Sequence, residues 1–325
     1  MKNLFTILPL FFGSLLMAEE PSVTAQPAAD YIRYREAKTA GQPDVLETAV
    51  SRFQKGDHSI DLISVVHLGD AAYFEKLNES LKSYDIVFYE MVGGPYTEEK
   101  ARLSKQAASP DDNLAQVQGL QQMAKSLLGL EFQLDGLDYL AANFVHADMT
   151  ADEFSAHTEK GNGVSDLITR ALKIAQSGNV KGVPATEAEA NRLMSKVMGA
   201  VLTGNSNELK RSLGPILAEA ESFIIQLEEE EGTVLISRRN EIVIDKIEAN
   251  LSTRGPGPKT DAVLYGAGHM PDLEIRLREM GYEKSDTEWE ASWVIEEGAN
   301  QNPNAPNLND MMQQLSGLMK MMNPQ

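Results

Sequence analysis

The sequence of 325 residues contains no cysteine. This excludes a disulfide framework, a cysteine nucleophile and a lipid-carrying cysteine behind an N-terminal signal. The stability of the folded protein must therefore come from its buried core. A chain of this length with 42% hydrophobic residues can bury one large core or two small ones.

Basic residues are scarce as well. The chain has 29 Lys and Arg against 48 Asp and Glu, so its formal net charge is -19. This surface would repel a nucleic acid, which argues against nucleic acid as a partner. Solubility alone explains most of the excess carboxylates, so only carboxylates that cluster at a site carry functional information.

The apolar stretch at the N-terminus is too short to span a membrane. It covers Leu4–Ala18, whereas a membrane-spanning helix needs about 20 residues. Lys2 precedes it and Glu19–Pro21 follow it. This pattern predicts a secretory signal peptide over residues 1–18, with a retained membrane anchor as the alternative. We therefore expect a secreted or periplasmic protein with no stable membrane span after cleavage.

Familiar catalytic and nucleotide-binding motifs are missing too. The chain has no Gly-x-Ser-x-Gly elbow and no intact dinucleotide-binding or Walker glycine pattern. Acyl-enzyme, redox and nucleotide-dependent functions therefore lack their usual markers.

Hydrophobic patterning predicts an α/β fold with α+β-like features. We expect a central mixed sheet with parallel β-α-β units, an N-terminal β-hairpin and a large helical insert. The domain covers residues 45–297, with the insert at about 98–251, and an arm over 19–44 precedes it. Residues 298–325 are an Asn- and Pro-rich linker followed by a Met-rich amphipathic tail helix.

Five segments are predicted as sheet strands: 45–53, 60–66, 85–90, 262–265 and 289–295. The first two form a hairpin around the turn Lys55-Gly56-Asp57. The third and fourth are short apolar runs typical of buried parallel strands, and the last is an antiparallel edge strand. Between the second and third strands, apolar spacing over about residues 70–83 predicts a helix that Asp70 caps.

Helical periodicity dominates the insert. Six helices are predicted there: 114–130, 137–144, 164–175, 185–201, 207–227 and 234–251. A run of helices between two groups of strands is expected to cover the sheet or to form a lid. A further helix, with Pro271 near its first position, follows the strand over 262–265.

Three chemically active side chains stand at the ends of predicted strands: His67, Glu90 and His269. Ligands of open α/β sheets bind at the carboxyl ends of parallel strands. Two imidazoles and a carboxylate are a common ligand set for Zn, Mn or Co, and Asp70 offers a further carboxylate. A single histidine at a strand end is more often structural, but two of only five histidines, each beside glycine, favour a shared site. A metal ion there would activate water.

Further polar residues could reach the same edge of the sheet. Arg238 and Arg239 are adjacent and cannot both face an apolar core. One of them is expected to face the site, or else the pair is solvated or bound to the acidic run Glu228–Glu231. His146 and Asp148 could line the pocket, although Asp148 could simply cap the helix that follows.

The motifs of the chain resemble those of the TraB/GumN-like group, which includes the TIKI metalloproteases. The resemblance rests on Ser64-Val65-Val66-His67, Tyr89-Glu90, Arg239-Asn240 and Gly266-Ala267-Gly268-His269, and it covers about residues 45–295. The group has two Gly-x-x-His motifs; the second is intact here, and the first has Ser64 in the glycine position. The resemblance implies metal-binding or catalytic roles for His67, Glu90 and His269, with Arg239 and Asn240 in support.

Together these patterns favour an exported metal-dependent hydrolase, either a metallopeptidase or an amide or ester hydrolase, with a peptide or small-molecule substrate. The divalent ion would be Mn, Co or Zn, with His67, His269, Glu90 and Asp70 as candidate ligands. Glu90 would act as a ligand or as the general base.

Two other functions are compatible with the same residues. One is a non-catalytic module that binds a small ligand or haem in the same pocket, and the other is an inert structural or signalling protein. The Met-rich tail helix would either pack on its own domain or contact a partner.

Overall fold

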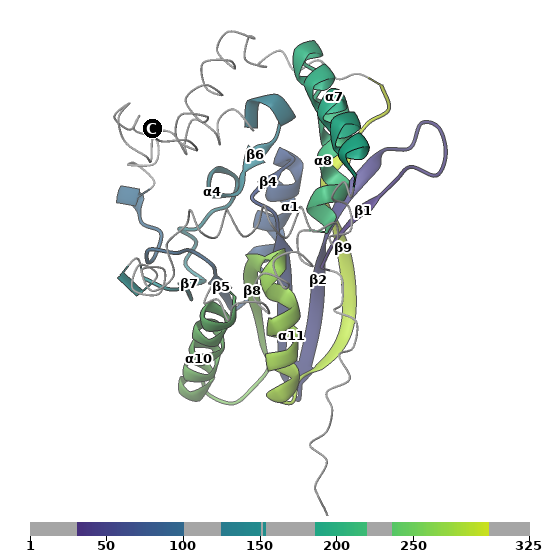
Figure 1. Cartoon of the computed structure of the whole chain (residues 1–325). Coiled ribbons are helices and arrows are strands. Elements are labelled where there is room, and N and C mark those ends of the chain that lie inside the picture. Colours follow the sequence, from purple (N-terminus) through teal and green to yellow (C-terminus); the bar gives the residue numbers. More distant parts are fainter. Residues whose placement is uncertain (1–30, 101–124, 151, 154–185, 220–235, 299–325) are drawn as a thin grey trace, which may run out of the picture.

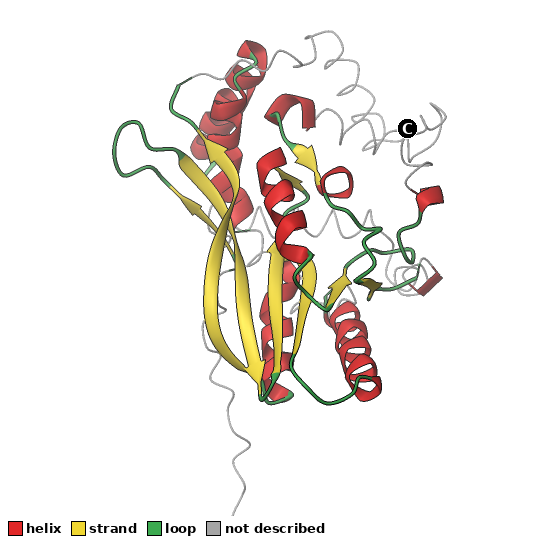
Figure 2. Ribbon diagram, turned by 180° about the vertical axis from the view of Figure 1, so that it is seen from behind, coloured by secondary structure: helices red, strands yellow, loops and turns green. Residues whose placement is uncertain are grey.

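The computed structural model describes residues 31–100, 125–150, 152–153, 186–219 and 236–298. The signal peptide, the Met-rich tail helix and the helix predicted over 164–175 lie outside these residues. Within them, a mixed β-sheet has helices on both of its faces (Figure 1, Figure 2). The predicted α/β class is therefore confirmed.

The main sheet, within the described residues, consists of seven strands: β1 (Ile32–Arg35), β2 (Asp44–Lys55), β3 (His58–Val65), β5 (Ile86–Tyr89), β7 (Phe144–His146), β8 (Lys259–Gly266) and β9 (Glu283–Ile295). β9 runs antiparallel along one edge of β2, while β1 and then β3 pair with successive parts of its other edge. Beyond β3 the order is β8, β5 and β7, all parallel. A separate two-stranded sheet joins β4 (Leu68–Gly69) to β6 (Glu131–Phe132).

The predicted hairpin and the predicted closing strand are both present. β2 and β3 are joined at Gly56, whose φ of +58° favours glycine. β9 is the antiparallel edge strand, although it begins earlier than predicted, at Glu283. Part of the predicted arm belongs to the sheet as β1, because Tyr31 is fully buried beside it.

The helix predicted over 137–144 is wrong. The spacing of Leu137, Leu140 and Phe144 imitates a helix, but Phe144 begins the short strand β7, which pairs with β5. The side chain of Asn143 donates to the backbone carbonyls of Leu81 and Tyr84, where the first helix ends before β5, and holds the turn before β7. The insert is therefore not helical throughout, because pairing with the sheet overrides local periodicity here.

The helices of the described residues are α1 (Ala71–Leu81), α4 (Gln133–Gly136), α7 (Glu187–Thr203), α8 (Ser206–Ala218), α10 (Ser237–Thr253), the 3₁₀ turn η1 (Ala267–His269) and α11 (Met270–Glu279). α10 and α11 cover one face of the sheet, and α1 covers the other (Figure 1). Strand β8 shows the alternation that this layering requires. Its Val263 and Tyr265 belong to the core under α10 and α11, and Ala262 and Leu264 to the core under α1.

A third apolar cluster joins α7 and α8 to the upper end of the sheet. Ala200 of α7 and Leu209 of α8 pack in one cluster with Trp293 of β9 and with Ala267, two residues before His269. α7 and α8 therefore pack beside the ends of β3 and β8. Among the described helices, none combines the length and the hydrophobicity needed to cross a membrane.

Candidate active site at the ends of the parallel strands

The order β3–β8–β5 places three predicted site residues next to one another. Glu90 follows the last residue of β5, His269 closes the turn η1 after β8, and His67 lies two residues beyond the end of β3. Because the three strands are parallel neighbours, their carboxyl ends share one edge of the sheet.

Glu90 is a partly buried carboxylate whose surroundings favour its ionised form. Its Oε1 accepts from Nη2 of Arg239 (2.6 Å), and its Oε2 accepts from the backbone amide of Gly266 (2.7 Å). Burial alone would raise the pKa of Glu90. The charges of His269, when protonated, and of Arg239 outweigh burial and, with the Gly266 hydrogen bond, lower the pKa to about 2.

Gly266 permits this approach between strand and carboxylate. A Cβ at position 266 would lie 3.3 Å from Oε2 of Glu90. The absence of a side chain at Gly266 thus lets the carboxylate of Glu90 accept a hydrogen bond from the Gly266 amide, and a larger residue would crowd this contact.

Arg239 is the centre of the cluster. It lies in the first turn of α10 and is 8% exposed. Its Nε and Nη2 donate to the two carboxylate oxygens of Asp148 (2.8 and 2.6 Å), a bidentate pair with a carboxylate that is fully buried. The remaining nitrogen, Nη1, donates to Nε2 of His269 (3.1 Å).

Asn240 fixes the protonation pattern of His269. Its amide nitrogen donates to the carbonyl oxygen of His269 (3.0 Å) and to Oδ2 of Asp272 (2.7 Å), so its Oδ1 must be the atom that faces His269. This oxygen lies 2.7 Å from Nδ1 and can only accept. The proton of neutral His269 is therefore on Nδ1, and the lone pair of Nε2 points toward Arg239 and Glu90.

Neutral His269 is also the form that its surroundings favour. The residue is 4% exposed, and burial lowers its pKa to about 4, with Glu90 opposing and Arg239 assisting the shift. Its Nε2 lies 3.6 Å from Oε1 of Glu90.

His67 lies at the rim of this cluster. It is exposed in the bend between β3 and β4, and its carbonyl oxygen accepts from the amide of Gln133. Its charge contributes to lowering the pKa of Glu90, so the imidazole is within electrostatic range of the carboxylate. Ser64, in the glycine position of the first motif, is fully buried and donates to the carbonyl oxygen of Tyr31 (2.9 Å).

The structure does not bring Asp70 into the cluster. One carboxylate oxygen accepts from Nζ of Lys210 (2.9 Å), and the other accepts from the backbone amide of Val294 (2.6 Å). Asp70 occupies the N-cap position of α1, as predicted, but its side chain does not cap the helix. It joins α1, α8 and β9 instead.

Two donor atoms of the cluster are spaced like two ligands of one divalent ion. Nε2 of His269 and Oε1 of Glu90 are 3.6 Å apart, and two ligand atoms of one tetrahedral ion are roughly 3.4 Å apart. In the described part of the chain, however, no three His, Cys, Asp or Glu residues are grouped to hold a metal. Arg239 donates to both candidate ligand atoms, so its guanidinium lies where the cation would lie.

Among the other predicted site residues, Asp148 binds Arg239 within the cluster, and Arg238 lies outside it. Arg238 pairs with Glu241 on the exposed side of α10, whereas Arg239 faces the site. Asp272, in the first turn of α11, was missed, and the only sequence signal for it is its place three residues after His269. His146 lies near the cluster, and its Nε2 interacts with the carbonyl oxygen of Met91.

The chain matches no family model, and no curated protein matches its sequence. Any functional assignment therefore depends on the motifs and on the geometry described above.

Proposed function

We propose that the protein is an exported, metal-dependent hydrolase of amide or ester bonds that belongs to the TraB/GumN-like group. The observation that supports this most directly is the pair of Glu90 and His269. A partly buried, ionised carboxylate faces the lone pair of a neutral imidazole at the sheet edge where α/β proteins bind ligands. Four residues of the resembling motifs, Glu90, Arg239, Asn240 and His269, also form one hydrogen-bonded cluster.

The pKa values divide the roles between the two residues. A carboxylate with a pKa of about 2 is a weak base at neutral pH, so Glu90 serves as a ligand and a fixed negative charge rather than as the general base. His269 is neutral at pH 7 and offers Nε2 as a ligand. A divalent ion held by these two, with His67 at the rim, would supply a polarised water.

Arg239 has two functions in this proposal. Binding of the ion requires Arg239 to release Oε1 of Glu90 and Nε2 of His269, while its bidentate contact with Asp148 keeps the guanidinium beside the site. The same guanidinium would donate to the oxyanion that forms when water attacks a carbonyl.

The proposal is tested by elemental analysis of the purified mature chain, alone and as His67→Ala, His269→Ala and Glu90→Gln variants. We expect one equivalent of Mn, Co or Zn in the parent chain and none in the His269→Ala variant. The rate of hydrolysis, measured on a panel of peptides and esters, should rise and fall with the metal content of each variant. Glu241→Gln, an exposed change on α10, is the control and should leave both unchanged.

Two results would contradict the proposal. Full metal content in folded His269→Ala would show that His269 is not a ligand. A chain that is isolated without metal and hydrolyses nothing in the panel after metal addition would show that the protein is not a metal-dependent hydrolase. A Soret absorption band in the isolated protein would instead support the haem-binding alternative. Export is tested separately, because the N-terminus of the secreted or periplasmic protein should lie near Glu19.

A further inference from the structure

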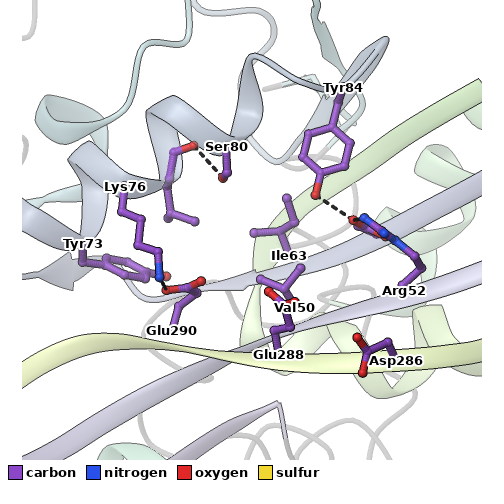
Figure 3. Close-up of a pocket in the computed structure, with 12 residues that line it drawn as sticks. Val50, Arg52, Ile63, Tyr73, Lys76, Ser80, Tyr84, Asp286, Glu288 and Glu290 are labelled. Atoms are coloured by element: carbon purple, nitrogen blue, oxygen red, sulfur yellow. Dashed lines mark hydrogen bonds and ion pairs between the residues drawn. The ribbon is translucent and has the colours of Figure 1, made fainter.

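A cavity lies on the other face of the sheet from α10, away from Glu90, Arg239 and His269. It has a volume of about 120 Å³ and opens between α1 and the strands β2, β3 and β9 (Figure 3). By volume, it would hold roughly four water molecules. Nothing in the proposed hydrolase function uses this space.

The floor of the cavity is apolar. Val50 of β2, Ile63 of β3 and Leu77 of α1 line it, and Figure 3 shows the side chains of Val50 and Ile63 near its centre. A floor of this kind favours the hydrocarbon part of a ligand, because burying each methylene group contributes about 0.8 kcal/mol.

Two paired cations close the ends of the cavity. At one end, Lys76 of α1 binds Glu290 of β9 (2.5 Å). At the other, Arg52 binds Asp61 through two hydrogen bonds, and the hydroxyl of Tyr84 donates to the same carboxylate (Figure 3). Both basic side chains of the lining thus already have a carboxylate partner.

Two further carboxylates of the lining have no basic partner among the described residues. Asp286 and Glu288 alternate along β9 and therefore project from the same face of the strand. Glu288 rises from β9 beside Val50 (Figure 3). The lining thus combines an apolar floor with an excess of two negative charges over its basic groups.

We propose that this cavity binds a primary alkylammonium group, such as the side chain of a lysine or a free aliphatic amine. The four-carbon stem of lysine can lie along the apolar floor, and the ammonium would lie against the exposed carboxylates of Asp286 and Glu288. A neutral ligand would gain no attraction from the two carboxylates, and a bare metal ion would make no use of the apolar floor. The site is independent of the proposed hydrolase activity.

The test is a titration of the full mature chain, followed by methyl NMR of Val50, Ile63 and Leu77. The ligand is n-butylammonium chloride at constant ionic strength, and 1-butanol is its neutral match. We expect saturable shifts with the amine and at least fivefold weaker binding of the alcohol. Glu288→Gln should weaken amine binding about two- to fivefold, as for loss of one exposed ion pair, and Asp286→Asn combined with it should weaken binding further.

Glu283→Gln is the matched control, because it removes an exposed carboxylate from the same strand outside the cavity. It should bind the amine like the parent chain. Equal binding of amine and alcohol, an unchanged Glu288→Gln variant, or an equal loss in the control would each overturn the proposal. A capped Gly-Lys-Gly peptide, compared with its norleucine analogue, separates the sources: lysine-selective binding identifies a polypeptide side chain, and binding of butylammonium alone identifies a free amine.

Discussion

Asn240 shows how one uncharged side chain can determine the chemistry of another. Its two amide hydrogens are both committed, to His269 and Asp272, and this leaves its oxygen to accept the proton on Nδ1 of His269. Arg276 in turn donates to Asp272 (2.6 Å), so the chain of contacts reaches into α11. Partners of this kind fix the tautomer of a histidine and thereby decide which nitrogen faces the site.

Replacing Asn240 by leucine should therefore change both the tautomer and the stability. The Nδ1 proton of His269 would lose its acceptor, and each buried polar group left unpaired costs about 1–3 kcal/mol. We expect the ¹⁵N spectrum of His269 to lose the pure Nδ1–H pattern, and urea unfolding to show the loss of stability. Asn250→Leu on the same helix is the control: its Oδ1 is buried and has no hydrogen-bond partner among the described residues, so this variant should be as stable as the parent or more so. An unaltered His269 spectrum in Asn240→Leu would rule out this role.

Sequence patterns locate the residues of this cluster better than they locate their side-chain contacts. Glu90 and His269 could be predicted because strand ends are recognisable, and strand ends meet at one edge of a sheet. Asp70 also stands near a strand end, but its carboxylate points to Lys210 and Val294. Side-chain direction depends on packing against elements distant in sequence, and no local pattern records it.

At the level of elements, one buried ion pair joins α10 to the end of the sheet in addition to the apolar contacts of the helix. Arg239 in its first turn and Asp148, just beyond β7, join the helix to the end of the sheet, and both side chains are buried. The neighbouring pair, Arg238 with Glu241, has the same chemistry on the exposed side of the helix.

These two pairs allow a matched prediction. Asp148→Ala leaves the buried Arg239 without its bidentate partner and should lower the free energy of unfolding by about 3–5 kcal/mol. Glu241→Ala removes an exposed pair and should cost at most about 1 kcal/mol. Urea unfolding measures both, and hydrogen exchange should show increased opening of α10 only in Asp148→Ala. Equal losses in the two variants would show that burial does not set the strength of the Arg239 pair.

Sequence patterns predict the long elements correctly, and they also predict the short strand β5, whose apolar residues form a continuous run. β2, β3 and α10 carry enough residues for their hydrophobic period to be distinct. β1 and β7 are too short for a period to be read, and they exist because β2 and β5 offer free edges. Local patterns therefore predict an almost entirely helical insert, although it supplies the strands β6 and β7 and, through Asp148, a site residue.

At the scale of the whole molecule, the net charge of -19 and the buried polar cluster respond oppositely to acid. Protonating surface carboxylates relieves the mutual repulsion of a strongly acidic chain, which favours the compact state. The cluster acts in the other direction, because His269 and Glu90 both have pKa values below those of the free side chains. The cluster's contribution can be isolated only by comparing variants.

His269 should make the protein less stable as the pH falls from about 6.5 to about 4. The unfolded chain binds a proton on this imidazole near pH 6.5, whereas the folded chain keeps it neutral until about pH 4, so acid favours the unfolded state in this interval. The full effect is on the order of 3 kcal/mol, and Glu90 adds a loss of the same sign between its ordinary pKa of 4.5 and about 2. Urea unfolding of EDTA-treated protein between pH 7.5 and 4.5 measures this, with His269→Gln to remove the titrating group. His67→Gln, which replaces an exposed imidazole, should keep the parent's acid-side loss, and a His269→Gln variant with the same pH dependence as the parent would show that His269 is not the group responsible.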